Sequence, residues 1–388
     1  MDITLQPGKL AGIVTPPPSK SLAHRMLICS AFAEKALHLN CPDSNEDIDA
    51  TADCLRGLGA HIQKTAHGYR IEPIRSLPTS ADLFCKESGS TLRFLLPIVG
   101  ILGVNATFHM EGRLPQRPLS PLWEEMQRMG CTLSRPTENT ITCTGKLHPG
   151  TYYMNGEISS QFLSGLTFAF WIAGSEAYTL VIDGTVRSKP YYEMTKSVIH
   201  RFCHSLPDEI TVESDWSNAA FWLTANILGS DLDVLHLEQD STQGDRKILD
   251  ILPQLQRGMS TICATDIPDL VPILSVAAAA CHGAVFTDIA RLRMKESDRV
   301  TSIIAMLENL GCKVDSTENT LTVHGTGLTG GCVNSFGDHR IAMSAAIAAT
   351  ICEKPVTILG AECVKKSYPK FWETYHRVCR NTSMPLEG

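Results

Sequence analysis

The 388-residue sequence lacks the motifs of several large protein classes. It contains no C-x-x-C pair and no H-E-x-x-H, and none of its basic segments is a Walker A or a G-x-G-x-x-G loop. These absences argue against a zinc site, a P-loop NTPase and a Rossmann dinucleotide site. No apolar run approaches the roughly 18–20 residues of a membrane span, and Met1 to Leu10 show no secretory pattern. We therefore expect a cytoplasmic protein that makes no contact with a membrane.

An excess of basic residues is also missing. Lys and Arg number 34 against 41 Asp and Glu, which gives a net charge of −7. This balance argues against a general nucleic-acid-binding protein, although it allows a local basic pocket. The hydrophobic fraction of 43% is sufficient for a packed core, and the length is typical of two or three domains.

The 14 cysteines show no metal-ligand or disulfide spacing, and most lie inside apolar stretches. This pattern favours buried thiols that behave as small hydrophobic side chains. A nucleophilic cysteine remains possible, but no cysteine stands out. We expect neither a metal nor a cofactor.

A short pattern recurs along the chain. It consists of the end of an amphipathic helix, a glycine, a strand, a polar turn and a second strand, and it occurs in Cys54–Pro73, Glu125–Gly145 and Met306–Gly325. The glycines that end the three helices are Gly59, Gly130 and Gly311. The repetition indicates one supersecondary unit used several times.

Two further segments, Ser197–Val212 and Ile248–Ile262, begin in the same way and then stop short. Each has the helix, but each lacks part or all of the following pair of strands. We interpret them as shortened copies of the repeat.

Helices of another kind lie between the repeats, and they are apolar nearly all round, which predicts burial on every side. Their segments are Met26–Phe32, Leu92–Leu102, Phe162–Ile172, Ala219–Leu228, Leu270–Cys281 and Ile341–Cys352. Six such helices predict an α/β fold of two similar lobes, each with three buried helices covered by sheets and amphipathic helices. We expect one lobe to contain residues 1–18 and 214–388 and the other residues 19–213, with crossing segments near 15–19 and 213–215.

Four of the buried helices begin with a Ser, Gly or Asp cap followed by a basic or amide side chain. The segments are Pro18–Arg25, Glu87–Arg93, Ser159–Gln161 and Asp338–Arg340. A helix N-terminus carries free N–H donors and partial positive charge, so Lys20, Arg93 and Arg340 are unfavourable there unless an anion binds. Ordinary capping beside solvated basic side chains explains any one of these sites. The recurrence favours helix N-termini that converge on anionic ligands.

Further basic groups lie in loops, at Arg113 and Arg117, in Arg291–Arg299, and at Lys365 and Lys366. Two carboxylates stand among or near such groups. Glu296 follows Lys295, and Asp269 precedes a buried helix. A helix cap is the alternative for Asp269, and a solvated charged face is the alternative for Arg291–Arg299. In a closed cationic site the two carboxylates could serve as general base and general acid.

Eight segments in order carry a family resemblance: PPSKSLAHR, ESGSTLRFLLP, SSQFLSGL, SKPYY, IPDLVP, RMKESDR, DHRIAM and KKSYP. Together they resemble 5-enolpyruvylshikimate-3-phosphate (EPSP) synthase, from about Gln6 to Tyr375. The resemblance implies an enolpyruvyl-transferase-like fold, an inside-out α/β barrel of two lobes. Each lobe is built from three β-α-β-α-β-β units, and two crossing segments join the lobes.

The resemblance also implies a reaction, in which shikimate 3-phosphate and phosphoenolpyruvate give an enolpyruvyl ether and phosphate through a tetrahedral intermediate. The catalytic residues that it implies are Asp269, Glu296, Lys20 and Lys366. The shikimate 3-phosphate ligands that it implies are Lys20, Ser21, Arg25, Ser159, Ser160, Gln161, Ser188, Tyr191, Asp269 and Lys295. The phosphoenolpyruvate ligands that it implies are Lys20, Gly89, Arg117, Gln161, Arg299, Arg340 and Lys366. Arg93 and His339 are expected to support the site.

Two alternatives remain open. The related enolpyruvyl transferase that acts on UDP-N-acetylglucosamine shares the fold, but it has an Asn where Ser21 follows Lys20, and it has a reactive loop cysteine that Arg113–Pro118 lacks. A decayed copy that binds anions without turnover would be consistent with the two shortened repeats. The retention of Lys20, Asp269, Glu296 and Lys366 together argues against decay. We expect a monomer with small-molecule substrates as its only partners.

Overall fold

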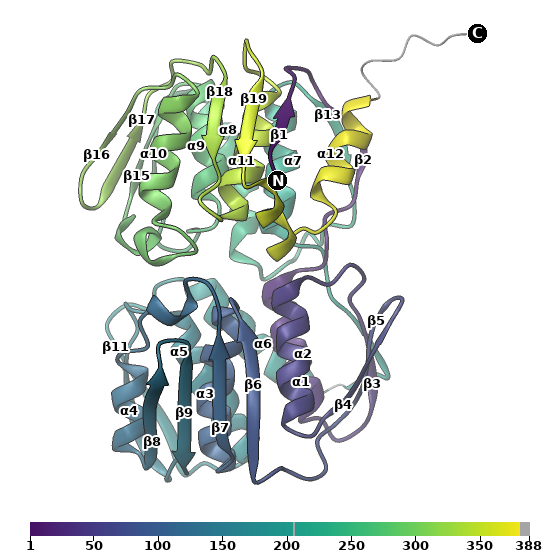
Figure 1. Cartoon of the computed structure of the whole chain (residues 1–388), viewed down its shortest axis with the longest axis vertical. Helices are drawn as coiled ribbons and strands as arrows, with labels where there is room; N and C mark the ends of the chain where they lie inside the picture. Colours follow the sequence, from purple (N-terminus) through teal and green to yellow (C-terminus); the bar gives the residue numbers. More distant parts are fainter. Residues whose placement is uncertain (205, 381–388) are drawn as a thin grey trace. The chain divides into compact units, whose positions relative to one another are not determined.

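The structure is a computed structural model, and it describes residues 1–204 and 206–380 (Figure 1). The chain forms two compact units. The inserted unit is Pro18–Glu213, and the terminal unit is Met1–Pro17 together with the chain from Ser214 onward. Each unit has a hydrophobic core made only of its own residues.

The inserted unit repeats helices and strands in a regular order. Its elements are α1 (Lys20–Ala31), β3 (Leu37–Asn40), α2 (Glu46–Gly57), β4 (His61–Thr65), β5 (Gly68–Glu72), β6 (Ser80–Lys86), α3 (Gly89–Leu102), β7 (Asn105–Met110), η1 (Leu114–Gln116), α4 (Leu122–Arg128), β8 (Cys131–Thr137), β9 (Thr140–Gly145), β10 (Gly150–Asn155), α5 (Ser160–Ala173), β11 (Tyr178–Asp183), α6 (Lys189–His204) and β12 (Glu209–Thr211). The strands form three sheets, in the orders β12-β3-β5-β4, β6-β7-β9-β8 and β10-β11. In Figure 1 the second of these sheets lies over α3 and α5.

The terminal unit follows the same plan. Its elements are β1 (Ile3–Leu5), β2 (Ala11–Val14), α7 (Trp216–Ile227), β13 (Asp231–Val234), η2 (Gly244–Lys247), α8 (Ile248–Arg257), β14 (Ser260–Cys263), α9 (Val271–Ala280), β15 (Ala284–Thr287), η3 (Ala290–Met294), α10 (Arg299–Asn309), β16 (Val314–Ser316), β17 (Thr320–Val323), β18 (Gly331–Asn334), α11 (His339–Ala349), β19 (Val356–Leu359), η4 (Ala361–Lys366) and α12 (Phe371–Arg380). Its sheets have the orders β13-β2, β14-β15-β17-β16 and β1-β19-β18.

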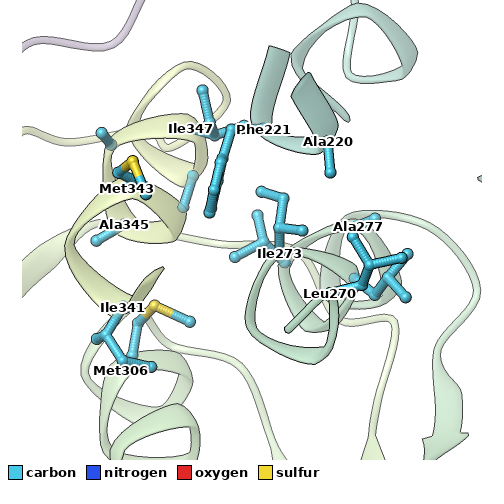
Figure 2. Close-up of a cluster of buried hydrophobic side chains, with 14 of the residues drawn as sticks. Ala220, Phe221, Leu270, Ile273, Ala277, Met306, Ile341, Met343, Ala345 and Ile347 are labelled. Atoms are coloured by element: carbon cyan, nitrogen blue, oxygen red, sulfur yellow. The ribbon is translucent and has the colours of Figure 1, made fainter. Parts of the chain in front are cut away.

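The six helices expected to be buried are α1, α3, α5, α7, α9 and α11. Burial on every side is confirmed for α1, α3, α9 and α11, whereas α5 and α7 each keep several residues that are only partly buried. Every residue of α11 is buried, and so are all but two of the residues of α3. Figure 2 shows Phe221 of α7, Ile273 of α9 and Ile347 of α11 in one cluster of the terminal unit. Apolar side chains on all faces make such helices insoluble unless other elements cover them, which explains why sheets and amphipathic helices surround them.

The recurring glycines end the amphipathic helices as predicted. Gly59, Gly130 and Gly311 all have positive φ. At Gly59, with φ +104°, a Cβ atom would also lie 2.6 Å from the carbonyl oxygen of Ser76. A side chain is therefore excluded at this turn on both conformational and steric grounds.

The two shortened repeats are confirmed. After α6 the chain enters β12, which pairs with β3, and after α8 it enters β14, so neither helix is followed by a hairpin. Within the described chain, β11 consequently pairs only with β10, and β13 only with β2. No helix in the described residues is long and apolar enough to cross a membrane.

Candidate active site

The buried helices of the predicted motifs begin with side-chain caps. Ser88 accepts a hydrogen bond from Thr91 N at the start of α3, and Ser159 accepts one from Gln161 N at the start of α5. Asp338 caps α11 by accepting from Arg340 N. The start of α1 differs, because Ser19 makes no side-chain cap bond there and Lys20 is the first helical residue. The predicted caps therefore hold for three of the four motif helices.

Lys20 has a carboxylate partner that sequence reasoning missed. Its Nζ lies 2.9 Å from Asp47 Oδ2, and both side chains are largely shielded from solvent. Asp47 belongs to the first turn of α2, where acidic residues are common because they face the positive end of the helix dipole. Its sequence position therefore looks like ordinary helix capping and carries no signal of the pairing.

Gly89 lies against two guanidinium groups. A Cβ atom at this position would come within 2.8 Å of both Arg93 Nη1 and Arg117 Nη1. Arg93 donates to Gln161 Oε1 at 2.9 Å and to the carbonyl oxygen of Pro118 at 3.1 Å, and Gln161 Nε2 donates to Ser90 Oγ at 3.0 Å. Arg117 has no carboxylate partner among the residues that the structure describes. Arg93 and Arg117 therefore concentrate positive charge beside the backbone of Gly89, which has no side chain.

Arg25 is buried, and each of its three guanidinium nitrogens donates a hydrogen bond. Its guanidinium donates to Thr195 Oγ1 at 2.8 Å, to Ser21 O at 2.6 Å and to Tyr191 O at 2.8 Å. Burial lowers the pKa of Arg25 to about 10, and its guanidinium lies 5.0 Å from the ring centroid of Phe94. These contacts tie the start of α1 to the start of α6.

Ser188 lies just before α6, and its φ of +53° is unusual for a residue with a side chain. Ser188 is buried, and its carbonyl accepts from Tyr191 N at 3.1 Å. Ser159 and Ser160 lie at the start of α5. With Ser21 at the start of α1, the predicted serine ligands therefore lie at the N-terminal ends of three helices.

In the terminal unit one buried arginine binds three carboxylates. Arg299 has an exposed fraction of 0%, and its Nε donates to Asp338 Oδ2 at 3.0 Å. Its Nη1 donates to Asp269 Oδ1 at 2.7 Å, and its Nη2 donates to Glu296 Oε2 at 2.7 Å. The guanidinium thereby holds the two predicted catalytic carboxylates on one planar fork.

Asp269 also contacts two other cations. Arg340 Nη2 lies 3.1 Å from Asp269 Oδ2, and Lys295 Nζ lies 3.4 Å from Asp269 Oδ1. Burial alone would raise the pKa of Asp269, but Arg340, Lys295 and Arg299 outweigh that effect and hold the pKa well below its usual range. Burial lowers the pKa of Lys295, although Asp269 opposes that shift. Asp269 is therefore a fully ionised carboxylate of low basicity in this state.

The remaining predicted residues of the terminal unit lie near the cap of α11. His339 is buried in the first turn of α11, next to Arg340. Lys366 ends η4 and donates to Gly337 O at 3.4 Å, one residue before Asp338. The structure thus brings Asp269, Lys295, Glu296, Arg299 and Arg340 into one ion-pair network and places Lys366 beside the cap.

Asp245 is a further buried carboxylate that the sequence did not single out. It accepts a hydrogen bond from Ser217 Oγ, and burial, followed by the nearby charge of Asp269, raises its pKa to about 6. Asp338 was recognised in the sequence as a cap, but not as a partner of Arg299. The partners of Asp245 and Asp338 are set by tertiary packing, which the spacing of residues in the sequence does not reveal. Within the described residues, no group of three His, Cys, Asp or Glu side chains could hold a metal ion.

The comparisons with known proteins agree on one family. The family model for EPSP synthase (3-phosphoshikimate 1-carboxyvinyltransferase) matches residues 5–207 and 203–375. A 3-phosphoshikimate 1-carboxyvinyltransferase from Clostridium kluyveri is 36% identical over 413 aligned positions, which cover 96% of this chain and 96% of the relative.

Solved structures show the same fold. EPSP synthase from Acinetobacter baumannii superposes with a TM-score of 0.77 at 24% identity, covering 97% of this chain and 98% of that one. The enolpyruvyl transferase NikO from Streptomyces tendae superposes with a TM-score of 0.71 at 16% identity, covering 97% of this chain and 96% of that one. At these identities the two likenesses concern the fold alone.

Proposed function

The chain belongs to the EPSP synthase family, and from that premise we propose how its residues carry out the reaction of the family. The protein is a transferase that moves the enolpyruvyl group of phosphoenolpyruvate to shikimate 3-phosphate and releases phosphate, in the biosynthesis of aromatic compounds. The observation that carries this conclusion is the 36% identity to a 3-phosphoshikimate 1-carboxyvinyltransferase along 96% of the chain.

We propose that the group around Gly89 binds phosphoenolpyruvate. Its support is the convergence of the Arg93 and Arg117 guanidiniums on Gly89 at the N-terminus of α3, where two cations and the backbone N–H groups of the first turn favour an anion. Gln161 is fixed by its bonds to Arg93 and Ser90, so it presents a stable amide to the ligand. Lys20, Arg299, Arg340 and Lys366 complete the proposed ligand set.

We propose that shikimate 3-phosphate is bound by hydroxyl and basic groups at helix N-termini. Ser159 and Ser160 lie at the start of α5, and Ser21, Arg25, Ser188 and Tyr191 lie where α1 meets the start of α6. Backbone N–H groups at these ends favour a phosphate dianion. Lys20, Gln161, Asp269 and Lys295 contribute the remaining contacts.

The proton transfers belong to Asp269 and Glu296. Asp269 accepts the proton of the shikimate 5-hydroxyl while the hydroxyl oxygen bonds to C2 of phosphoenolpyruvate. Glu296, assisted by Lys20 or Lys366, protonates the methylene carbon and gives a tetrahedral intermediate with a new methyl group. The methyl group then returns a proton to the Glu296 carboxylate, the bond from C2 to the phosphate oxygen breaks, inorganic phosphate leaves with that electron pair, and the double bond forms again. The shared fork of Arg299 supports these roles because it fixes both carboxylates.

The negative charge of the bound substrates raises the basicity of Asp269 enough for it to remove the proton of the shikimate 5-hydroxyl. In this state three cations hold the pKa of Asp269 far below the value that suits a general base near neutral pH. An anionic substrate that takes up charge from Arg340, Lys295 or Arg299 weakens this effect and raises the pKa. The base therefore becomes effective only when substrates are bound.

The setting of the reaction follows from its chemistry. Both substrates are small anions, and the steps above need no electron transfer, so we propose that the enzyme works without a cofactor. We further propose a cytoplasmic monomer. Sedimentation of the purified protein at micromolar concentration, giving a single species of about 42.4 kDa, would support the monomer.

The experiment that tests the function is phosphate release from purified protein. Phosphoenolpyruvate and shikimate 3-phosphate are supplied together and separately. We expect release only when both are present. A folded protein that binds phosphoenolpyruvate without release would indicate a decayed binder, and release with UDP-N-acetylglucosamine as acceptor would indicate the related transferase.

A further inference from the structure

A chain of buried hydrogen bonds links three helices of the inserted unit. His24 Nδ1 of α1 lies 2.7 Å from Thr51 Oγ1 of α2, and Thr51 Oγ1 lies 2.6 Å from Thr91 Oγ1 of α3. Thr91 Oγ1 then donates to Ser88 Oγ at 2.7 Å. All four side chains are at most 1% exposed.

The direction of every bond in this chain follows from proton counting. Thr91 has one hydroxyl proton, and it goes to Ser88. Thr51 must therefore donate to Thr91, because two hydroxyl oxygens at 2.6 Å require one proton between them, and the other acceptor near Thr51 Oγ1, the carbonyl oxygen of Asp47, lies 3.5 Å away, too far to compete for that proton. The Thr51 proton is then used, so His24 must donate to Thr51 from Nδ1. This assigns the Nδ1–H tautomer to His24.

His24 is also neutral. Its Nε2 is buried and has no hydrogen-bond partner among the described residues, so a proton there would place an unpaired charge in the core. Burial lowers the pKa of His24 to about 3, which agrees with this geometry. Burying an unpaired imidazolium at His24 would therefore cost more free energy than the loss of one neutral hydrogen bond.

The position of the chain connects it to the proposed substrate groups. Lys20 precedes His24 by one helical turn on α1, and Asp47, the partner of Lys20, precedes Thr51 by one turn on α2. At the other end, Ser88 caps α3 immediately before Gly89. The hydrogen bonds thus set the starts of α1 and α2 against the start of α3.

We propose that His24, Thr51 and Thr91 are positioning residues that hold Lys20 and Gly89 in register for phosphoenolpyruvate. The inference rests on the proposed function, because that function assigns phosphoenolpyruvate to these two residues. None of the three side chains needs to touch the substrate. A loss of the chain lets α3 shift relative to α1 and misplaces the ligand groups.

Thr51→Val is the first test, because it removes the hydroxyl while nearly keeping the shape of the side chain. His24 Nδ1–H then lacks an acceptor, and Thr91 loses its donor. We expect the KM for phosphoenolpyruvate to rise roughly 5–20-fold, as for a buried group left unsatisfied, while the KM for shikimate 3-phosphate changes less than about twofold. Thr51→Ser should restore the wild-type KM.

Thr224→Val is the matched control. Thr224 is also a buried helical threonine, but its hydroxyl has no hydrogen-bond partner in the described structure. This variant should leave both KM values unchanged. Equal rises in both KM values for Thr51→Val, or a failure of Thr51→Ser to rescue, would overturn the positioning role.

A second measurement tests the chain without activity. ¹⁵N NMR of histidine-labelled wild-type protein should show one histidine in the neutral Nδ1–H form, identified by its disappearance in His24→Asn. The Asn amide can replace the Nδ1 donor, so this variant should also keep the KM for phosphoenolpyruvate near the wild-type value. A His24 signal of the Nε2–H form would refute the assigned direction even if the enzyme is active. If phosphate release fails for the wild type while the tautomer is observed, the proposed function fails and the hydrogen-bond chain stands.

Discussion

The arginines of the candidate site have different partners in the two units. In the inserted unit, Arg25 and Arg93 donate to neutral carbonyl, hydroxyl and amide oxygens, and Arg117 has no carboxylate partner in the described chain. In the terminal unit, Arg299 and Arg340 donate to carboxylates. An arginine bound to neutral oxygens keeps its charge available for an anion, whereas one bound to carboxylates is compensated. From this difference we propose that anion capture falls mainly to the inserted unit and proton transfer to the terminal unit.

The largest expected effect is a loss of kcat when the proposed proton donor of the terminal unit is removed. Glu296→Gln keeps an oxygen for Arg299 Nη2 but removes the transferable proton. We expect kcat to fall roughly 10²–10⁴-fold, the usual range for a general acid or base. Steady-state phosphate release measures it, with the exposed Glu308→Gln as control. A wild-type kcat for Glu296→Gln would show that this carboxylate has no catalytic role.

The next effect concerns the inserted unit. In Gly89→Ala the new methyl group would lie 2.8 Å from the ends of Arg93 and Arg117, so both guanidiniums must move. We expect the KM for phosphoenolpyruvate to rise roughly 10–100-fold, equivalent to the loss of a charged hydrogen bond, with little change for shikimate 3-phosphate. Gly258→Ala serves as control because no atom lies within 4 Å of its added Cβ. Unchanged affinity for phosphoenolpyruvate would remove Gly89 from the site.

A smaller effect distinguishes the carboxylates of the terminal unit by pH. Burial raises the pKa of Asp245 to about 6, so its ionisation destabilises the fold above that pH and has no effect below about 3.8. Asp245→Asn should therefore increase the free energy of unfolding by about 1–3 kcal/mol at pH 7, and the gain should vanish near pH 4. Urea denaturation at the two pH values measures it. A gain that is equal at both would show that ionisation is not the cause.

The pH dependence of Asp269 has the opposite sign. Its pKa is lowered in the folded protein, so its ion pairs stabilise the fold above its unfolded pKa, and this contribution is lost as the pH falls through the lowered folded value. The buried Asp245 and the partly exposed Asp269 therefore make opposite contributions to stability at neutral pH.

The fold could be predicted from the sequence where one segment contains the whole signal. Leu92–Leu102 is apolar on nearly every face, with Arg93 as the exception, which predicts a buried helix, and α3 occupies that position. Gly59 and Gly130 predict the turns at these helix ends, because only a glycine readily adopts positive φ there. The polar first turns of the buried helices lie outside the apolar stretches and were predicted from their capping motifs, Pro18–Arg25 for α1. The α1 helix begins at Lys20, six residues before the apolar stretch that predicted it.

The site could be predicted only in part, because its chemistry depends on pairs. The residues of the terminal network were found as charged motifs, but the carboxylate partners of Arg299 lie up to 39 positions away in the sequence. In the sequence, Asp47 and the two threonines that are hydrogen-bonded in line with His24, Thr51 and Thr91, look like ordinary helical residues. Their partners are selected by the packing of helices, and no local spacing records it.

The most direct test of the contrast between the units is the stability of two arginine variants without ligand. We would measure the free energy of urea unfolding for Arg117→Gln and Arg299→Gln. Loss of Arg299 should cost about 3–5 kcal/mol, because it leaves the buried Asp338 carboxylate without its cation. Loss of Arg117 should change stability by less than about 0.5 kcal/mol, as for a residue with no buried partner. Equal losses for the two variants, or a larger loss for Arg117→Gln, would contradict the account.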